Sequence, residues 1–167
     1  MTTFYIFRHG ETFATKGKVH YGLKIWHATI LPEAKPVIER LGQYLKTKES
    51  DYQSSSEFLR CKETTKIITS VTGKEFVTDK RLNEFVFETF GGFRRRIQSF
   101  LDDIHKTGYK NVMVCTHGAV IAGLVNLLTE GNFEWHDIKE YPSPGILTEI
   151  VGNNMKQISF RDDMTAT

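Results

Sequence analysis

The sequence has few cysteines, no long apolar run and no large excess of charge of either sign. Two cysteines, Cys61 and Cys115, are too few for a disulfide framework, which favours a reducing, cytoplasmic setting. No apolar stretch could span a bilayer and the first residues do not resemble a signal peptide, so we expect no membrane association. A formal net charge of +2 is too small to indicate a nucleic-acid partner.

The size and composition of the chain are those of one globular domain. The chain has 167 residues, of which 40% are hydrophobic and 25% charged, as is usual for a soluble protein with one core. No internal repeat, low-complexity tract or linker interrupts it. We therefore expect a single domain over residues 1–167.

Apolar periodicity predicts strands that alternate with helices. The expected strands are Thr3–Phe7, a short strand near Tyr52, Phe76–Val77, Val112–Cys115, and the pair Ile146–Val151 and Met155–Phe160 joined by a turn. The expected helices start at Leu31–Glu33, run from near Leu59 to Gly73, carry the stripe from Ile97 to Ile104, and span Ala119–Leu128, with an irregular loop over residues 81–92. This order predicts an α/β three-layer sandwich, with helices flanking a largely parallel central sheet.

Two histidines follow the two most apolar predicted strands. His9 and His117 are each followed by glycine, and both would point into one crevice if their strands are parallel neighbours. The helix that begins near Ala119 would direct free N–H groups at the same place, as anion sites require. Arg8 and Arg60 add side chains that bind phosphate oxygens through two parallel hydrogen bonds. The pattern therefore predicts a phosphoryl pocket.

Four segments resemble, in order, the motifs of the histidine phosphatase superfamily, also called phosphoglycerate mutase-like. One isolated match would be weak evidence, whereas four in the family's order are specific. The segments are Arg8-His9-Gly10-Glu11-Thr12, Ser54-Ser55-Ser56-Glu57-Phe58-Leu59-Arg60-Cys61-Lys62-Glu63-Thr64, Leu82-Asn83-Glu84 and Thr116-His117-Gly118.

The resemblance implies a phosphoglycerate mutase-like fold and a role for each matched residue. His9 would attack phosphorus and form a phosphohistidine intermediate. Arg8, Arg60 and His117 would hold the phosphoryl oxygens and stabilise the transition state. Glu84 would protonate the leaving oxygen and then activate water. No metal or cofactor is implied, because the cationic side chains would do the work that a metal ion would otherwise do. The expected activity is metal-independent hydrolysis of a phosphomonoester.

The chain departs from the family pattern at two places that bear on the substrate. Thr15 occupies a phosphate-binding position where the family often has Asn, so the amide of that contact is missing. The stretch after Glu84 reads Glu88, Phe90 and Gly91 where the family has Gly, Trp and a second Glu. These changes affect the expected substrate and rate more than the reaction type.

Two alternatives to the phosphatase remain open. One is a phosphoglycerate mutase-type enzyme, although one predicted helix between Glu84 and His117 leaves little room for the segments that enclose a mutase substrate. The other is a phosphate-binding protein of the same fold that has lost turnover. The expected partner is a small phosphorylated substrate or a protein phosphohistidine, and Glu84 favours an ester with a poor leaving group.

Several conspicuous residues have simpler interpretations. Neither cysteine has an arginine six residues on, as a cysteine phosphatase needs, so both are predicted to be small apolar residues. Arg94–Arg96 is predicted to be a solvated helix face in preference to a site that recruits anions. No histidine spacing indicates a metal site. Four phenylalanines are predicted to form core and pocket wall, namely Phe85, Phe87, Phe90 and Phe93.

Overall fold

The computed structural model describes residues 1–162. The strands are β1 (Thr3–Arg8), β2 (Tyr52–Ser55), β3 (Val77–Thr78), β4 (Asn111–Thr116), β5 (Ile146–Val151) and β6 (Asn154–Ser159). The α-helices are α1 (Phe13–Gly17), α2 (Ala34–Lys46), α3 (Leu59–Thr72), α4 (Phe90–Thr107) and α5 (Gly118–Thr129). Short 3-10 helices occupy Gly22–Lys24, Lys80–Leu82 and Trp135–Lys139. None of the helices among these residues is long and apolar enough to cross a membrane.

Within residues 1–162, six strands form one mixed sheet in the order β3-β2-β4-β1-β5-β6. The first four strands run parallel to one another, and β5 and β6 complete the edge in antiparallel orientation. Crossover helices make the parallel part possible, whereas a two-residue turn joins β5 to β6. The prediction of an α/β fold with a largely parallel sheet is confirmed.

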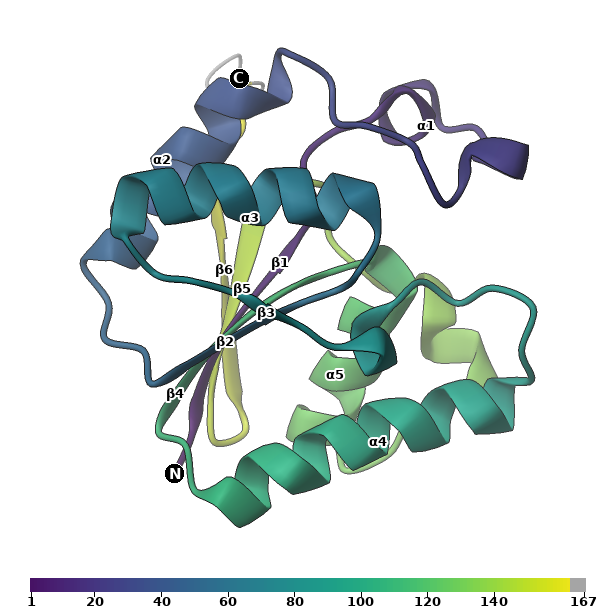
Figure 1. Cartoon of the computed structure of the whole chain (residues 1–167). Helices are drawn as coiled ribbons and strands as arrows, with labels where there is room; N and C mark the ends of the chain where they lie inside the picture. Colours follow the sequence, from purple (N-terminus) through teal and green to yellow (C-terminus); the bar gives the residue numbers. More distant parts are fainter. Residues whose placement is uncertain (163–167) are drawn as a thin grey trace.

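The sheet lies between two layers of helices, as Figure 1 shows with α2 and α3 above it and α4 and α5 below. The two faces of β1 explain this arrangement, because alternate side chains of a strand point to opposite faces. Tyr5 and Phe7 pack in the cluster with α2 and α3. Phe4 and Ile6 pack in the cluster with α4 and α5. A strand that is apolar on both faces therefore lies inside the three-layer sandwich.

The register of the parallel strands brings three carboxyl ends together. Arg8 of β1 pairs with Thr116 of β4, and Ser55 of β2 pairs with Cys115 of the same strand. The residues that follow these strand ends, His9, Ser56 and His117, therefore lie at the same edge of the sheet. This edge holds the candidate site.

Two predictions in the segment 81–97 are wrong. Helix α4 begins at Phe90, because Thr89 caps it by accepting a hydrogen bond from the Gly92 amide at 3.1 Å. The first turn of this helix contains two glycines, which interrupt the apolar pattern from which the helix was predicted. Phe87 was expected in the core or pocket wall, yet it is 97% exposed and has a left-handed backbone with φ of 51°.

Candidate active site

Three side chains meet where β1, β2 and β4 end. The imidazole rings of His9 and His117 lie 5.3 Å apart, centroid to centroid. The Ser56 hydroxyl lies 2.7 Å from Nε2 of His117. All three residues are fully buried. The parallel register, and not proximity in sequence, creates this cluster.

The geometry around His9 leaves one ring nitrogen free to act as a nucleophile. Nδ1 of His9 lies 2.8 Å from the carbonyl oxygen of Gly10. A carbonyl can only accept, so the proton of the neutral ring is on Nδ1 and the lone pair is on Nε2. Nε2 is buried without a partner among the described residues. Burial, followed by the charges of Arg8 and Arg60, holds the pKa of His9 well below its ordinary value, so the ring is neutral.

Arg60 is a fully buried cation with unused donors. Its Nη1 donates to the carbonyl of Ile25 at 2.5 Å, whereas its Nε and Nη2 have no partner within residues 1–162. Thr64, one turn along α3, donates to the carbonyl of Arg60 at 2.7 Å and accepts from the Gly10 amide at 2.8 Å. This hydroxyl ties α3 to the chain beside His9. Buried donors of this kind require an acceptor, and an oxyanion would supply it.

Two tyrosines cover the two arginines, and sequence reasoning missed both. The Tyr21 ring lies 4.2 Å from the guanidinium carbon of Arg60, and the Tyr21 hydroxyl bonds Thr12 at 2.8 Å. The Tyr141 ring lies 4.9 Å from the guanidinium carbon of Arg8. Both tyrosines come from loops without periodicity, so no local pattern marks them. Tyr21 shields the fully buried Arg60 from water and thereby strengthens its electrostatic attraction for an anion, whereas Tyr141 packs on Arg8, which remains partly exposed.

Glu84 lies beside His117. Its side chain is 17% exposed, with Oε2 lying 3.8 Å from Nδ1 of His117 and Oε1 accepting from the Phe85 amide at 2.9 Å. Burial raises the pKa of Glu84, while that amide and the nearby arginines act in the opposite direction. Burial also holds the pKa of His117 well below its ordinary value, with His9 and Arg60 adding to the effect. The pKa of the Glu84 carboxyl is thus shifted toward the protonated form beside His117, an arrangement that suits a general acid.

Thr15 and Ala119 are the other two predicted phosphate contacts. They differ in whether their hydrogen-bond donor is free. The Thr15 hydroxyl is engaged in a capping box, accepting from the Thr12 amide at 2.8 Å and donating to the Thr12 carbonyl at 3.2 Å. Ala119 lies in the first turn of α5, where backbone amides have no intrahelical acceptor. Ala119 can therefore donate to an anion without breaking a bond, whereas Thr15 would first have to release Thr12.

The two cysteines are buried beside the site and are not arranged as nucleophiles. Burial, together with Cys61, raises the pKa of Cys115 well above its ordinary value, so this thiol keeps its proton. The Sγ atom of Cys61 packs 3.6 Å from Nε2 of His117. Among residues 1–162, no group of three or more His, Cys, Asp or Glu side chains is placed to hold a metal ion.

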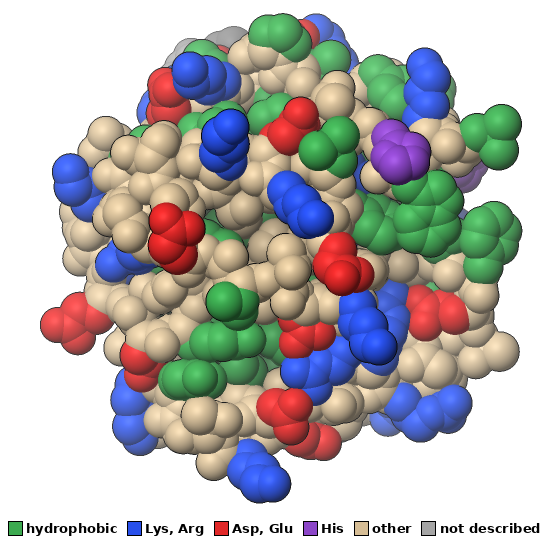
Figure 2. Space-filling view, viewed as in Figure 1, with side chains coloured by type: hydrophobic (Ala, Val, Ile, Leu, Met, Phe, Trp, Pro, Cys, Tyr) green, Lys and Arg blue, Asp and Glu red, His purple; other side chains and the backbone are tan. Residues whose placement is uncertain are grey.

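Two adjoining cavities open next to Arg8. The larger, of about 710 Å³, has Thr15, Tyr21, Glu84 and Tyr141 in its wall, and Glu84 lies 3.8 Å from His117 of the buried cluster. Hydrophobic side chains gather at the right of the face shown in Figure 2, over the segment that contains the 3-10 helix Gly22–Lys24. We take this larger cavity as the entrance for a substrate.

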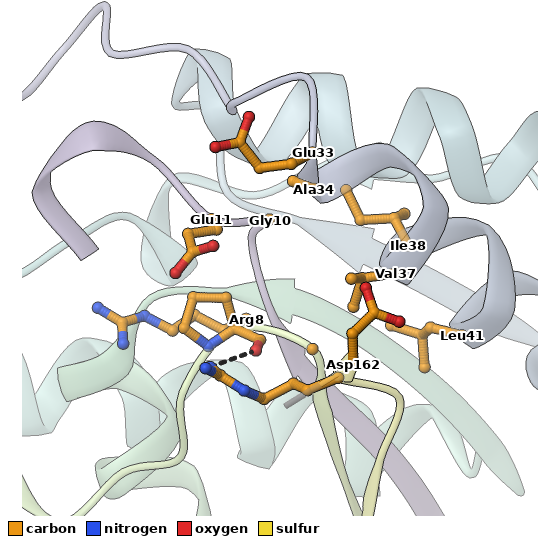
Figure 3. A pocket seen from close by; sticks show the side chains of 12 residues that line it. Arg8, Gly10, Glu11, Glu33, Ala34, Val37, Ile38, Leu41 and Asp162 are labelled. Atoms are coloured by element: carbon orange, nitrogen blue, oxygen red, sulfur yellow. Dashed lines mark hydrogen bonds between the residues drawn. The ribbon is translucent and has the colours of Figure 1, made fainter. Parts of the chain in front are cut away.

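The smaller cavity, of about 220 Å³, has an apolar floor formed by α2. Figure 3 shows Val37 and Leu41 on this floor, with the carboxylates of Glu11, Glu33 and Asp162 around it. Acidic side chains outnumber the arginines here, which disfavours an anion. The lining of the larger cavity therefore suits an anion better than that of the smaller one.

A three-layer α/β fold with paired histidines and arginines at one sheet edge defines a class of phosphoryl-transfer proteins. The chain belongs to the histidine phosphatase superfamily (branch 1), whose family model matches residues 4–92 and 85–141. It resembles the α-ribazole phosphatase from Shigella flexneri, with 16% identity, a TM-score of 0.77, and coverage of 95% of each chain.

Two further solved structures share the fold. The phosphoglycerate mutase from Bacillus anthracis str. Sterne has 17% identity and a TM-score of 0.71, covering 95% of this chain and 92% of that one. The protein histidine phosphatase SixA, complexed with tungstate, has 16% identity and a TM-score of 0.71, covering 95% and 97%. No curated protein matches the sequence. Identities this low establish the fold and leave the substrate open.

Proposed function

We propose that the chain hydrolyses a phosphomonoester through a phosphohistidine intermediate on His9. One observation carries the proposal. Nε2 of His9 and the unused donors of Arg60 are buried without partners among the described residues, next to Nδ1 of His117. A phosphoryl group placed there would expose its phosphorus to Nε2 of His9, and its oxygens would accept hydrogen bonds from Arg60.

The proposed reaction has two steps. In the first, Nε2 of His9 attacks phosphorus, the N–P bond forms, and the ester P–O bond breaks as Glu84 gives its proton to the leaving oxygen. In the second, the Glu84 carboxylate takes a proton from water, which attacks phosphorus and breaks the N–P bond. Inorganic phosphate leaves, and both residues return to their starting protonation states.

Cationic side chains would stabilise the charge that develops on the phosphoryl oxygens. Arg60 supplies charge from within the site, and Arg8 supplies it from the cavity wall. Because these groups are part of the chain, the proposed chemistry needs no metal. Activity should survive EDTA, and a loss of activity restored by Mg²⁺ or Zn²⁺ would contradict the mechanism.

The connection between Glu84 and His117 favours hydrolysis over transfer to a second hydroxyl. It contains α4 and β4 and no other α-helix or strand. The cavity beside Glu84 is therefore not enclosed by an inserted domain, and water can reach the phosphoenzyme. The presence of Glu84 favours an ester with a poor leaving group over a protein phosphohistidine, whose imidazole leaves readily.

Substitution of His9 tests the proposal most directly. We expect His9→Ala to abolish both the release of phosphate from an aryl phosphate and the labelling of the protein. Mass spectrometry of rapidly quenched wild-type protein under alkaline conditions should locate the phosphate on His9. His105→Ala is the matched control, because this exposed histidine of α4 contacts Phe4 near the opposite end of the sheet. Phosphate on Cys115 or on a serine, or full activity of His9→Ala, would overturn the proposal.

A further inference from the structure

A chain of hydrogen bonds behind His117 determines which of its nitrogens carries the proton. Nε2 of His117 lies 2.7 Å from the hydroxyl oxygen of Ser56. That hydroxyl lies 3.0 Å from Oδ1 of Asn83 and accepts from the Phe58 amide at 3.2 Å. Either atom of the His117–Ser56 pair could in principle be the donor, so the remaining bonds decide the direction.

The orientation of the Asn83 amide is unambiguous. The backbone N–H of Glu57, which can only donate, points at Oδ1 of Asn83 at 2.9 Å. The Glu57 carboxylate accepts from Nδ2 of Asn83 at 2.8 Å. Reversing the amide would bring two donors together at one end and two acceptors at the other. Oδ1 of Asn83 therefore faces Ser56 and must accept the hydroxyl proton.

Because Ser56 has one proton and gives it to Asn83, its oxygen can only accept from His117. His117 is thus the Nε2–H tautomer, and Nδ1 carries a lone pair when the ring is neutral. The two nitrogens of an imidazole point to nearly opposite sides, so Nδ1 faces away from Ser56. Nδ1 is buried without a partner among the described residues, and Oε2 of Glu84 lies 3.8 Å away.

A lone pair at this position would repel an oxyanion instead of binding it. We propose that His117 gains a second proton, at Nδ1, when a phosphoryl oxyanion enters the site, and that Ser56 and Asn83 are positioning residues that impose this requirement. The inference rests on the proposed function, because it assumes that the anion binds beside His9 and Arg60. One N–H bond forms at Nδ1 and one O–H bond breaks, either in a solvent acid or in the Glu84 carboxyl, which must then regain a proton from solvent before it can act on the leaving oxygen.

The groups that face His117 favour the imidazolium form of its ring only when the anion is present. Arg60 and Arg8 oppose a third positive charge in the empty site, and Cys61 packs against Nε2 without neutralising it. His9 adds to this opposition, and Arg96 acts in the same sense from farther away. A bound dianion reverses the balance, since it attracts all of these cations at once.

The protonation state of His117 can be read directly by nitrogen-15 NMR of the full chain, with and without tungstate. Tungstate is a suitable probe because it remains a dianion near neutral pH and cannot bring the proton itself. We expect a neutral Nε2–H ring in the free protein and protons on both nitrogens in the complex. A neutral His117 in the complex would overturn the inference and leave the phosphate site intact. Failure of tungstate to bind would overturn the proposed function together with it.

The pH dependence of tungstate affinity gives a second test, in a Glu84→Ala background. This variant removes the internal proton source without introducing an amide that could donate to Nδ1. Tungstate binding must then take one proton from water, so its affinity should fall by about tenfold per pH unit between about pH 7 and pH 9.

Ser56→Ala should remove this dependence when added to that background. Without Ser56 as an acceptor, neutral His117 can place its proton on Nδ1 and donate to the anion. Ser55→Ala is the matched control, because this buried serine donates to the Ser56 carbonyl at 3.0 Å and is not bonded to His117. A slope near zero for Ser56→Ala and an unchanged slope for Ser55→Ala are expected. An equal slope in both variants would overturn the inference.

Discussion

The phosphate cluster, consisting of His9, Arg60 and His117, is built differently from the acid loop, residues 83–89. The cluster is fully buried and is held by strand ends and by α3. The acid loop contains no helix or strand. Its exposure ranges from the mostly buried Glu84 to Phe87, which is 97% exposed. Under the proposed function, charge binding would thus depend on the sheet edge, whereas proton delivery would depend on a surface segment.

One arginine of α4 holds most of the acid loop in place. Arg96 donates to the carbonyl of Arg81 at 2.6 Å and to the carbonyl of Glu84 at 3.1 Å. It also forms an ion pair of 2.5 Å with Glu88, and both side chains are largely buried. The expectation that Arg94–Arg96 form a solvated face is therefore wrong for Arg96. The contrast suggests that the two regions can be disabled separately.

Removing a charge from the phosphate cluster should have the largest effect. Arg60→Ala should lower turnover of every phosphomonoester by about 10²-fold or more, because a buried partner of the transition-state charge is lost. Steady-state kinetics with an aryl and an alkyl phosphate would measure this. Arg94→Ala is the control, since within residues 1–162 the side chain of Arg94 is bonded only to Asn132 on the surface, at 2.9 Å. An unchanged rate in Arg60→Ala would show that the cluster does not bind phosphate.

The pH dependence of the rate, measured with alkyl and with aryl phosphates, should distinguish the phosphate cluster from the acid loop. His9 must be neutral to attack, and its pKa is lowered, so the rate should fall only well below pH 6.5. Glu84 must be protonated to act as the acid, and its pKa is raised above 4.5, so that function is lost as pH rises through the raised value. The alkaline decrease in kcat/KM should be steep for alkyl phosphates and shallow for aryl phosphates. Identical alkaline limbs would remove Glu84 from the acid role.

Releasing the acid loop should have a smaller and more selective effect. Arg96→Ala should lower kcat for alkyl phosphates by about 10- to 100-fold, because the Glu84 carboxyl is no longer held at the leaving oxygen. Aryl phosphates, whose leaving groups need little protonation, should be affected much less. Arg94→Ala again serves as the control on the same helix. Equal losses for both substrates would indicate that Arg96 acts on phosphate binding instead.

The smallest effect is expected at the tip of the acid loop. Phe87 adopts a φ of 51°, which costs an L-residue about 1–2 kcal/mol, and glycine adopts it without that cost. The greater backbone freedom of glycine in the unfolded chain offsets much of the gain. Phe87→Gly should therefore change the free energy of unfolding by less than about 1 kcal/mol, as measured by urea denaturation. A loss above about 2 kcal/mol would show that Phe87 packs against the protein in solution.

Local signals explain which predictions were accurate. The predicted strand Thr3–Phe7, with apolar residues on both faces, identified the sheet interior. Gly73 and Gly108 marked the ends of α3 and α4, where both adopt left-handed conformations. The start of α4 was missed because Gly91 and Gly92 lack helix propensity and the Thr89 cap is a contact between side chain and backbone.

What the sequence contains is the chemistry and the position of each reactive residue relative to its own strand or helix. His9 and His117 could be placed at strand ends because local periodicity is a property of neighbouring residues. The tertiary structure decided that Tyr21 covers Arg60 and that Ser56 and Asn83 together orient His117. Contacts of this kind join residues far apart in the chain, and they form only when packing and strand register bring those residues together.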